Sequence, residues 1–170
     1  MEDAERLISK YPGTSPGLVF QQGALAFRKG DYPLAQSLFR EAARRASEKT
    51  AESALFNENL AALNANDAAG AAALVKEAAG SAQLREHILF EQAHYAAKRM
   101  NPQAPELLAS FVALATDPAL KTQARLDQAE VALNLNPPDL ETVQAILPPL
   151  EKEQPVSYTH LRAHETRHDL

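Results

Sequence analysis

Cysteine and tryptophan are both absent from this 170-residue chain, and aromatic residues make up only 6% of it. Without cysteine the chain has no disulfides, zinc–thiolate sites or thiol nucleophiles. No apolar run approaches the roughly 20 residues that span a bilayer, and no basic-then-apolar signal sequence opens the chain, so we expect no membrane insertion. The net charge of -5 argues against nucleic acid as the main partner.

Glycine-rich phosphate loops, nucleophile elbows and zinc-protease helices are also missing from the sequence. We therefore expect no catalytic residues, no cofactor and no metal site.

The abundant residue is alanine, which favours helices and allows them to pack closely, and no segment alternates with the period of a strand. Residues that end one helix and cap the next recur at Gly30-Asp31, Asn66-Asp67, Gly80-Ser81 and Asp117-Pro118. Pro148-Pro149 is expected to stop the last helix. The predicted fold is all-α, with helices at about 16–29, 32–46, 50–65, 68–79, 82–99, 103–115, 118–134 and 139–147.

The segment QQGALAFRKGDYPLAQSLFREAA resembles the tetratricopeptide repeat over nearly its full length. Gly23 takes the small position of the first helix, and Ala35, Phe39 and Ala42 take the packing positions of the second. A second segment keeps this frame 36 residues later, with the packing positions at Ala71, Val75 and Ala78.

The resemblance implies a right-handed α-solenoid of stacked antiparallel helical hairpins. About four hairpins would occupy residues 16–152, and residues 1–15 would be the end of a preceding repeat helix. YPGTSP followed by GDY is also similar to linkers in bacterial envelope repeat proteins, which favours the periplasm or cell envelope over the cytoplasm.

Residues 153–170 are predicted to form a disordered tail, because their composition departs from the alanine-rich chain before them. Val156 to Thr166, VSYTHLRAHET, resembles the conceptual translation of a sequencing adaptor, and we interpret residues 156–170 as artefactual. His160, His164 and His168 would share one helix face as metal ligands under the alternative interpretation.

Aromatic residues recur along the first helices of the hairpins, at Phe20, Phe56 and Phe90, with intervals of 36 and 34 residues. In the tetratricopeptide family the equivalent position faces a concave groove that binds peptides. Two turns further along, the same face would carry Phe27, Leu63 and Ala97. These six residues are the predicted partner-binding set. The alternative is that the rings pack between repeats.

The leading functional hypothesis is a non-enzymatic protein-protein interaction scaffold that binds a peptide or partner helix, in a bacterial envelope or assembly complex. A spacer or oligomerisation region of a larger protein is the second hypothesis, with self-association through exposed terminal repeats. The third is an all-α enzyme with a pocket holding Glu86, His87, Glu91 and His94.

A basic concentration adds a further candidate surface. It comprises Arg28, Lys29, Arg40, Arg44 and Arg45. Such a cluster is a solvated face balanced by Glu41 and Glu48, or it binds an acidic partner.

Overall fold

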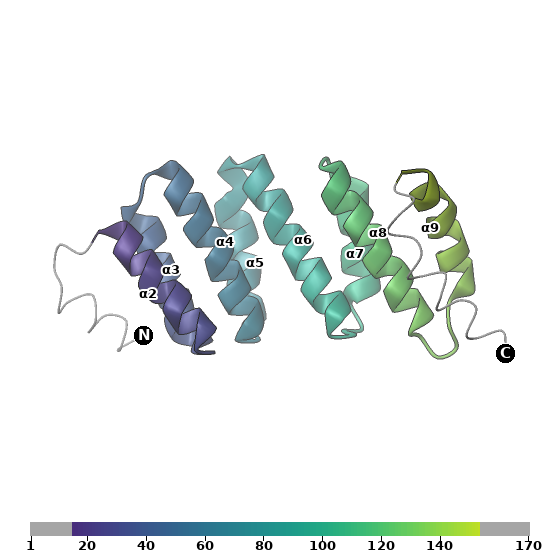
Figure 1. Cartoon of the computed structure of the whole chain (residues 1–170), viewed down its shortest axis with the longest axis horizontal. Coiled ribbons are helices and arrows are strands. Elements are labelled where there is room, and N and C mark those ends of the chain that lie inside the picture. Colours follow the sequence, from purple (N-terminus) through teal and green to yellow (C-terminus); the bar gives the residue numbers. More distant parts are fainter. Residues whose placement is uncertain (1–14, 154–170) are drawn as a thin grey trace. The chain divides into compact units, whose positions relative to one another are not determined.

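The computed structural model describes residues 15–153, and every regular element in that range is helical (Figure 1). The all-α prediction is thus confirmed, and no strand occurs between residues 15 and 153. The elements are α2 (Pro16–Arg28), α3 (Tyr32–Arg45), α4 (Glu48–Asn64), α5 (Ala68–Glu77), the 3-10 turn η1 (Ala78–Gly80), α6 (Ala82–Lys98), α7 (Ala104–Leu114), α8 (Pro118–Leu133) and α9 (Leu140–Glu153). No helix within these bounds has the length and apolar character needed to cross a bilayer.

The chain forms two compact units, Met1–Leu89 and Phe90–Leu170, with the boundary inside α6. The predicted N-terminal helix of residues 1–15 lies outside the described residues except for Ser15. The predicted tail of residues 153–170, with its three histidines, lies outside them except for Glu153.

The helices begin where the capping residues predicted them to begin. The side chains of Asp31 and Asp67 accept hydrogen bonds from the backbone N–H groups of Leu34 and Gly70, at 3.2 and 2.9 Å. Asp117 caps α8 in the same way, through the N–H groups of Ala119 and Leu120. Each cap satisfies donors that a helix N-terminus otherwise leaves without partners. The residues that precede two of these caps, Gly30 and Asn66, adopt left-handed φ values of 79° and 58°.

The expected stop at Pro148-Pro149 was wrong, because α9 continues through both prolines to Glu153. Prolines remove the N–H groups that would bond the carbonyls of residues 144 and 145. Gln144 and Ala145 are exposed residues. Two unpaired carbonyls cost a helix less at an exposed position than at a buried one, because water can hydrogen-bond them there.

In the first unit, α3 packs against both α2 and α4, and α5 packs against α4. Figure 1 shows α2 and α4 in front, with α3 and α5 behind them. Gly23 of α2 lies against the ring of Phe39, where a Cβ atom would come within 2.9 Å of two ring carbons. Ala35, Phe39 and Ala42 are all buried, which confirms the packing positions predicted for the first hairpin.

The equivalent positions of the second hairpin are buried at Ala71 and Ala78 and half-buried at Val75. In the second unit, α8 packs against α7 and α9, and the cluster on α8 and α9 is centred on Ala129, Ala132 and Val143. Small residues at such contacts let helix axes approach closely.

Candidate functional site

The six predicted partner-binding residues differ in how much surface they present. Phe20, Phe27, Phe56 and Leu63 of the first unit are half-buried, whereas Phe90 and Ala97 are buried with 7% and 5% of their surface exposed. The last two therefore offer little area to a partner.

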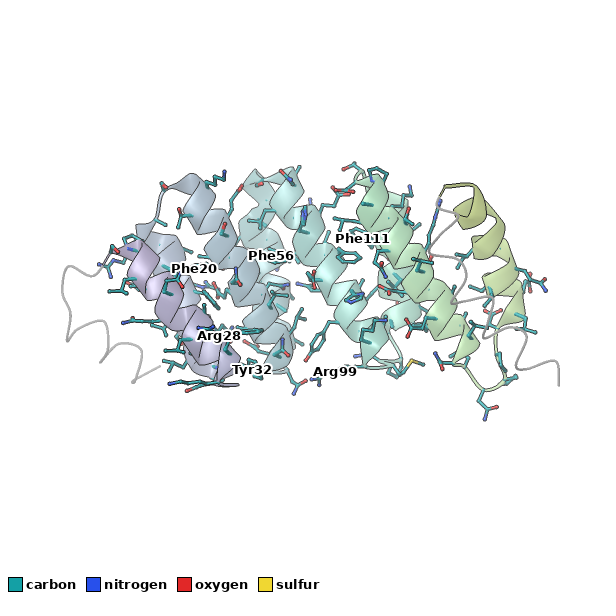
Figure 2. All side chains as sticks on the ribbon, viewed as in Figure 1. Phe20, Arg28, Tyr32, Phe56, Arg99 and Phe111 are labelled. Atoms are coloured by element: carbon teal, nitrogen blue, oxygen red, sulfur yellow. The ribbon has the colours of Figure 1, made fainter. Side chains whose placement is uncertain are left out.

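Most of the phenylalanine rings of this set contact other rings of their own unit. Phe20, labelled on α2 in Figure 2, meets Phe39 edge-on with ring centroids 5.3 Å apart. Phe27 meets Tyr32 at the same centroid separation, and Phe90 packs on Phe111 at 5.6 Å. In these contacts the rings pack against other residues of the protein. Such packing was the alternative to a partner-binding groove in the interpretation of the aromatic spacing.

Phe56, which Figure 2 labels, lies on α4 and lines an open depression of about 310 Å³ in the first unit. The depression lies between the first half of α4 and the beginning of α6. Its walls are formed by Lys49, Glu52, Ser53, Phe56, Asn57, Gln83, Leu84 and His87. Phe56 also packs against the buried cluster of Leu74 and Ile88, so one ring serves both the core and the surface.

An aromatic pair forms one side of this depression. The rings of Phe56 and His87 are nearly perpendicular, at 83°, with centroids 6.4 Å apart. His87 is fixed on its own helix, because Nδ1 lies 2.9 Å from the carbonyl oxygen of Gln83. A backbone carbonyl only accepts, so this contact selects the tautomer that carries its proton on Nδ1, in which Nε2 is an acceptor.

The polar residues of α4 in the depression make similar local hydrogen bonds. The hydroxyl of Ser53 donates to the carbonyl of Lys49 at 3.2 Å, and Nδ2 of Asn57 donates to the carbonyl of Ser53 at 2.8 Å. Lys49 and Glu52 bring opposite charges to the rim, and neither forms an ion pair with another side chain described between residues 15 and 153.

A second cluster of the first unit joins α3, α4 and α5 through charge. Arg40 bonds the carboxylate of Glu58 at 2.6 and 2.7 Å and that of Glu77 at 3.0 Å. Glu58 has only 1% of its side chain exposed, and its Oε2 atom has no hydrogen-bond partner among the described residues. Burial raises the pKa of Glu58, and the hydrogen bond from Arg40 opposes that rise. The same hydrogen bond raises the pKa of Arg40.

Carboxylates of the first unit therefore neutralise part of the positive charge of the predicted basic cluster. Arg40 pairs with Glu58 and Glu77, and Arg45 lies 3.8 Å from Glu41 on its own helix. The Arg45 pairing agrees with the predicted balance by Glu41, whereas the partners of Arg40 were missed. The available signal was a glutamate inside the alanine- and leucine-rich stretch of α4.

A third cluster lies in the second unit, around a buried carboxylate on α8. Nδ1 of His94 lies 2.6 Å from Oδ2 of Asp127, whose side chain is 1% exposed. Gln123 donates to the other oxygen at 3.2 Å, and Phe90 stacks on the imidazole with centroids 5.5 Å apart. A carboxylate that holds Nδ1–H fixes the tautomer and orientation of the ring. The sequence indicated His94 but not Asp127, which is 33 residues away.

The two histidines of the predicted enzyme pocket thus contact different partners. His87 belongs to the first unit and contacts Phe56, whereas His94 belongs to the second and contacts Asp127. Across residues 15–153 no three His, Asp or Glu side chains are grouped so that they could hold a metal ion.

Comparison of the chain with protein-family models, with curated proteins and with solved structures gave no match.

Proposed function

We propose that this chain is a non-catalytic interaction module of the tetratricopeptide type, a right-handed α-solenoid of stacked hairpins, and that it binds a peptide or partner helix. The observation that supports this most directly is the depression beside Phe56. The spacing of the aromatic residues independently predicts Phe56 as a partner-binding residue. It lines a hollow with an apolar wall and polar residues that keep unused hydrogen-bonding capacity, which is the composition of peptide-binding sites.

The hairpins give this surface a rigid support. α4 is held by the Arg40 cluster on one side and by the Leu74 cluster on the other, so the residues of the depression are fixed before a partner arrives. A preorganised site loses less conformational entropy on binding. The proposed place in a bacterial envelope or assembly complex has as its support only the short resemblance of residues 11–16 and the following turn to envelope linkers.

Filling the depression should abolish binding while the fold is kept. Ser53 is exposed at the depression, so Ser53→Trp inserts a ring without removing a core contact. We expect peptides selected from a random phage-displayed library on the immobilised chain to bind Ser53→Trp at least about tenfold more weakly, as measured by calorimetry. Phe56→Ala should give a similar loss.

Ala73→Trp is the matched control, because Ala73 is exposed on α5 and does not line the depression. Circular dichroism and thermal unfolding establish that each variant is folded. Full affinity in both folded Ser53→Trp and folded Phe56→Ala would remove the depression from the proposed function.

A spacer or self-assembling role is the second candidate, and one surface of α2 favours it. Leu18 and Leu25 are seven residues apart on one face of this helix and are 53% and 45% exposed. Apolar surface of this kind on a helix is what a neighbouring hairpin would cover.

We expect sedimentation velocity to show concentration-dependent association that disappears in the variant Leu18→Glu/Leu25→Glu. Leu114→Glu is the control, since Leu114 is 71% exposed on α7 of the second unit. A wild-type chain that sediments as a monomer at every concentration would contradict this role.

A further inference from the structure

We infer that the depression anchors its partner through one neutral aromatic side chain that carries a hydrogen-bond donor, a tyrosine or a tryptophan. This inference rests on the proposed function, and it specifies the chemistry of the group that enters the site. Three properties of the depression support it: its size, its hydrogen-bonding balance and its charge.

The size of the depression suits one large side chain. Its volume of about 310 Å³ lies at the lower end of the range for small-molecule pockets, about 300–1,000 Å³. The ring of Phe56, the side chain of Leu84 and the imidazole of His87 supply an apolar wall. The Phe56 and His87 rings are perpendicular, so an entering ring can pack edge-to-face or offset against either of them.

The hydrogen bonds that Ser53, Asn57 and His87 already make favour a ligand group that donates to these three residues. The proton of the Ser53 hydroxyl goes to the Lys49 carbonyl, and Nδ1–H of His87 is used by Gln83. One N–H of Asn57 is used by the Ser53 carbonyl. These three residues therefore retain mainly acceptors, which are the Ser53 lone pairs, Oδ1 of Asn57 and, in the tautomer that carries its proton on Nδ1, Nε2 of His87.

A phenol or an indole satisfies such acceptors while its ring covers the apolar wall. A phenyl ring of similar shape would cover the acceptors without offering a donor, and acceptors that lose water without gaining a partner oppose binding. Aromatic residues with a polar tip are also the common anchors of protein interfaces.

The charges at the rim favour a neutral ligand. Lys49 and Glu52 are three residues apart on α4, and neither forms an ion pair with a described side chain. A cationic ligand would be attracted by Glu52 and repelled by Lys49, and an anionic ligand would meet the reverse. The two charges offset each other for either sign, so a charged group gains little over a neutral one.

The test compares four capped amino acids by NMR titration of the whole ¹⁵N-labelled chain. The probes are N-acetyl-tyrosinamide, N-acetyl-phenylalaninamide, N-acetyl-tryptophanamide and N-acetyl-argininamide. The tyrosine and phenylalanine probes differ only in the hydroxyl group, which makes tyrosine the less hydrophobic of the two. We expect shifts in residues 49–57 and 83–87, with the tyrosine probe binding about tenfold more tightly than the phenylalanine probe.

Two variants locate the acceptors, and one serves as their control. Asn57→Leu and His87→Phe keep similar volume but remove Oδ1 and Nε2, so each should bring the preference for tyrosine over phenylalanine close to one. Asn64→Leu is the matched control, because Asn64 makes the same local hydrogen bond on α4, to the Leu60 carbonyl at 2.8 Å, but does not line the depression.

Each outcome bears on the inference alone or on the proposed function as well. Equal or tighter binding of the phenylalanine or arginine probe at the depression would overturn the inference and leave the proposed function in place. Absence of shifts there with every probe, while selected peptides still lose affinity in Ser53→Trp, would do the same. Loss of both signals would overturn both.

Discussion

Replacing Arg40 with methionine is expected to lower the free energy of unfolding by about 3–5 kcal/mol at neutral pH. The variant leaves the carboxylate of Glu58 buried, with 1% of its side chain exposed, and removes the cation that bonds it at 2.6 Å. The same substitution also frees Glu77, which is 40% exposed and can be hydrated, so most of the cost arises at Glu58. Urea denaturation followed by circular dichroism measures the change.

The double variant Arg40→Met/Glu58→Leu tests whether that cost comes from the uncompensated charge. A buried ion pair replaced on both sides by apolar groups of similar volume is often neutral or stabilising, so we expect the double variant to recover most of the loss. Arg85→Met, at an exposed position on α6, should stay within about 0.5 kcal/mol of wild type. A double variant as unstable as Arg40→Met would show that the arginine acts through packing instead.

The pH dependence of these variants gives a second measurement of the same effect. Burial raises the pKa of Glu58 above its ordinary value of 4.5. A carboxyl group whose pKa is higher in the folded chain stabilises the fold below the unfolded pKa, and this contribution is lost as pH rises through the folded pKa. Without Arg40 the pKa of Glu58 should rise further. The deficit of Arg40→Met should therefore be small near pH 4 and grow towards pH 7, and a deficit that stays constant would contradict this account.

The sequence predicted those features that short stretches of chain determine. Helix starts follow from Asp31, Asp67 and Asp117, because a cap involves only the next two or three residues. The burial of Gly23 and Phe39 was expected from the resemblance of the segment around them to the tetratricopeptide motif, which implies that both residues lie at packing positions.

The pairs that define the candidate sites could not be predicted in this way. Arg40 meets Glu58 across 18 positions, and His94 meets Asp127 across 33, on helices whose crossing geometry no local pattern specifies. The depression is formed by residues of α4 and α6, and the sequence alone does not show that these two helices lie side by side. The spacing of aromatic residues therefore predicted Phe56, but it could not place Gln83 and His87 next to Phe56.

The substitution Gly23→Leu should destabilise the wild-type protein but stabilise the variant Phe39→Ala. Phe39→Ala should lower the free energy of unfolding by about 3–5 kcal/mol, because the ring is 1% exposed and its loss leaves a cavity. Gly23→Leu alone should cost about 1–3 kcal/mol, because a Cβ atom already comes within 2.9 Å of the Phe39 ring and that ring is held by Phe20. In the Phe39→Ala background the same leucine should stabilise the protein, since it enters the space that the ring has left. Gly17→Leu, on the same helix with only Ser15 Oγ within 4.0 Å, should be neutral or slightly stabilising in either background. Urea denaturation of the wild type, the two single variants at positions 23 and 39 and their double variant measures the coupling. Additive effects at positions 23 and 39 would mean that α2 and α3 are not in the close contact on which the predicted hairpin depends.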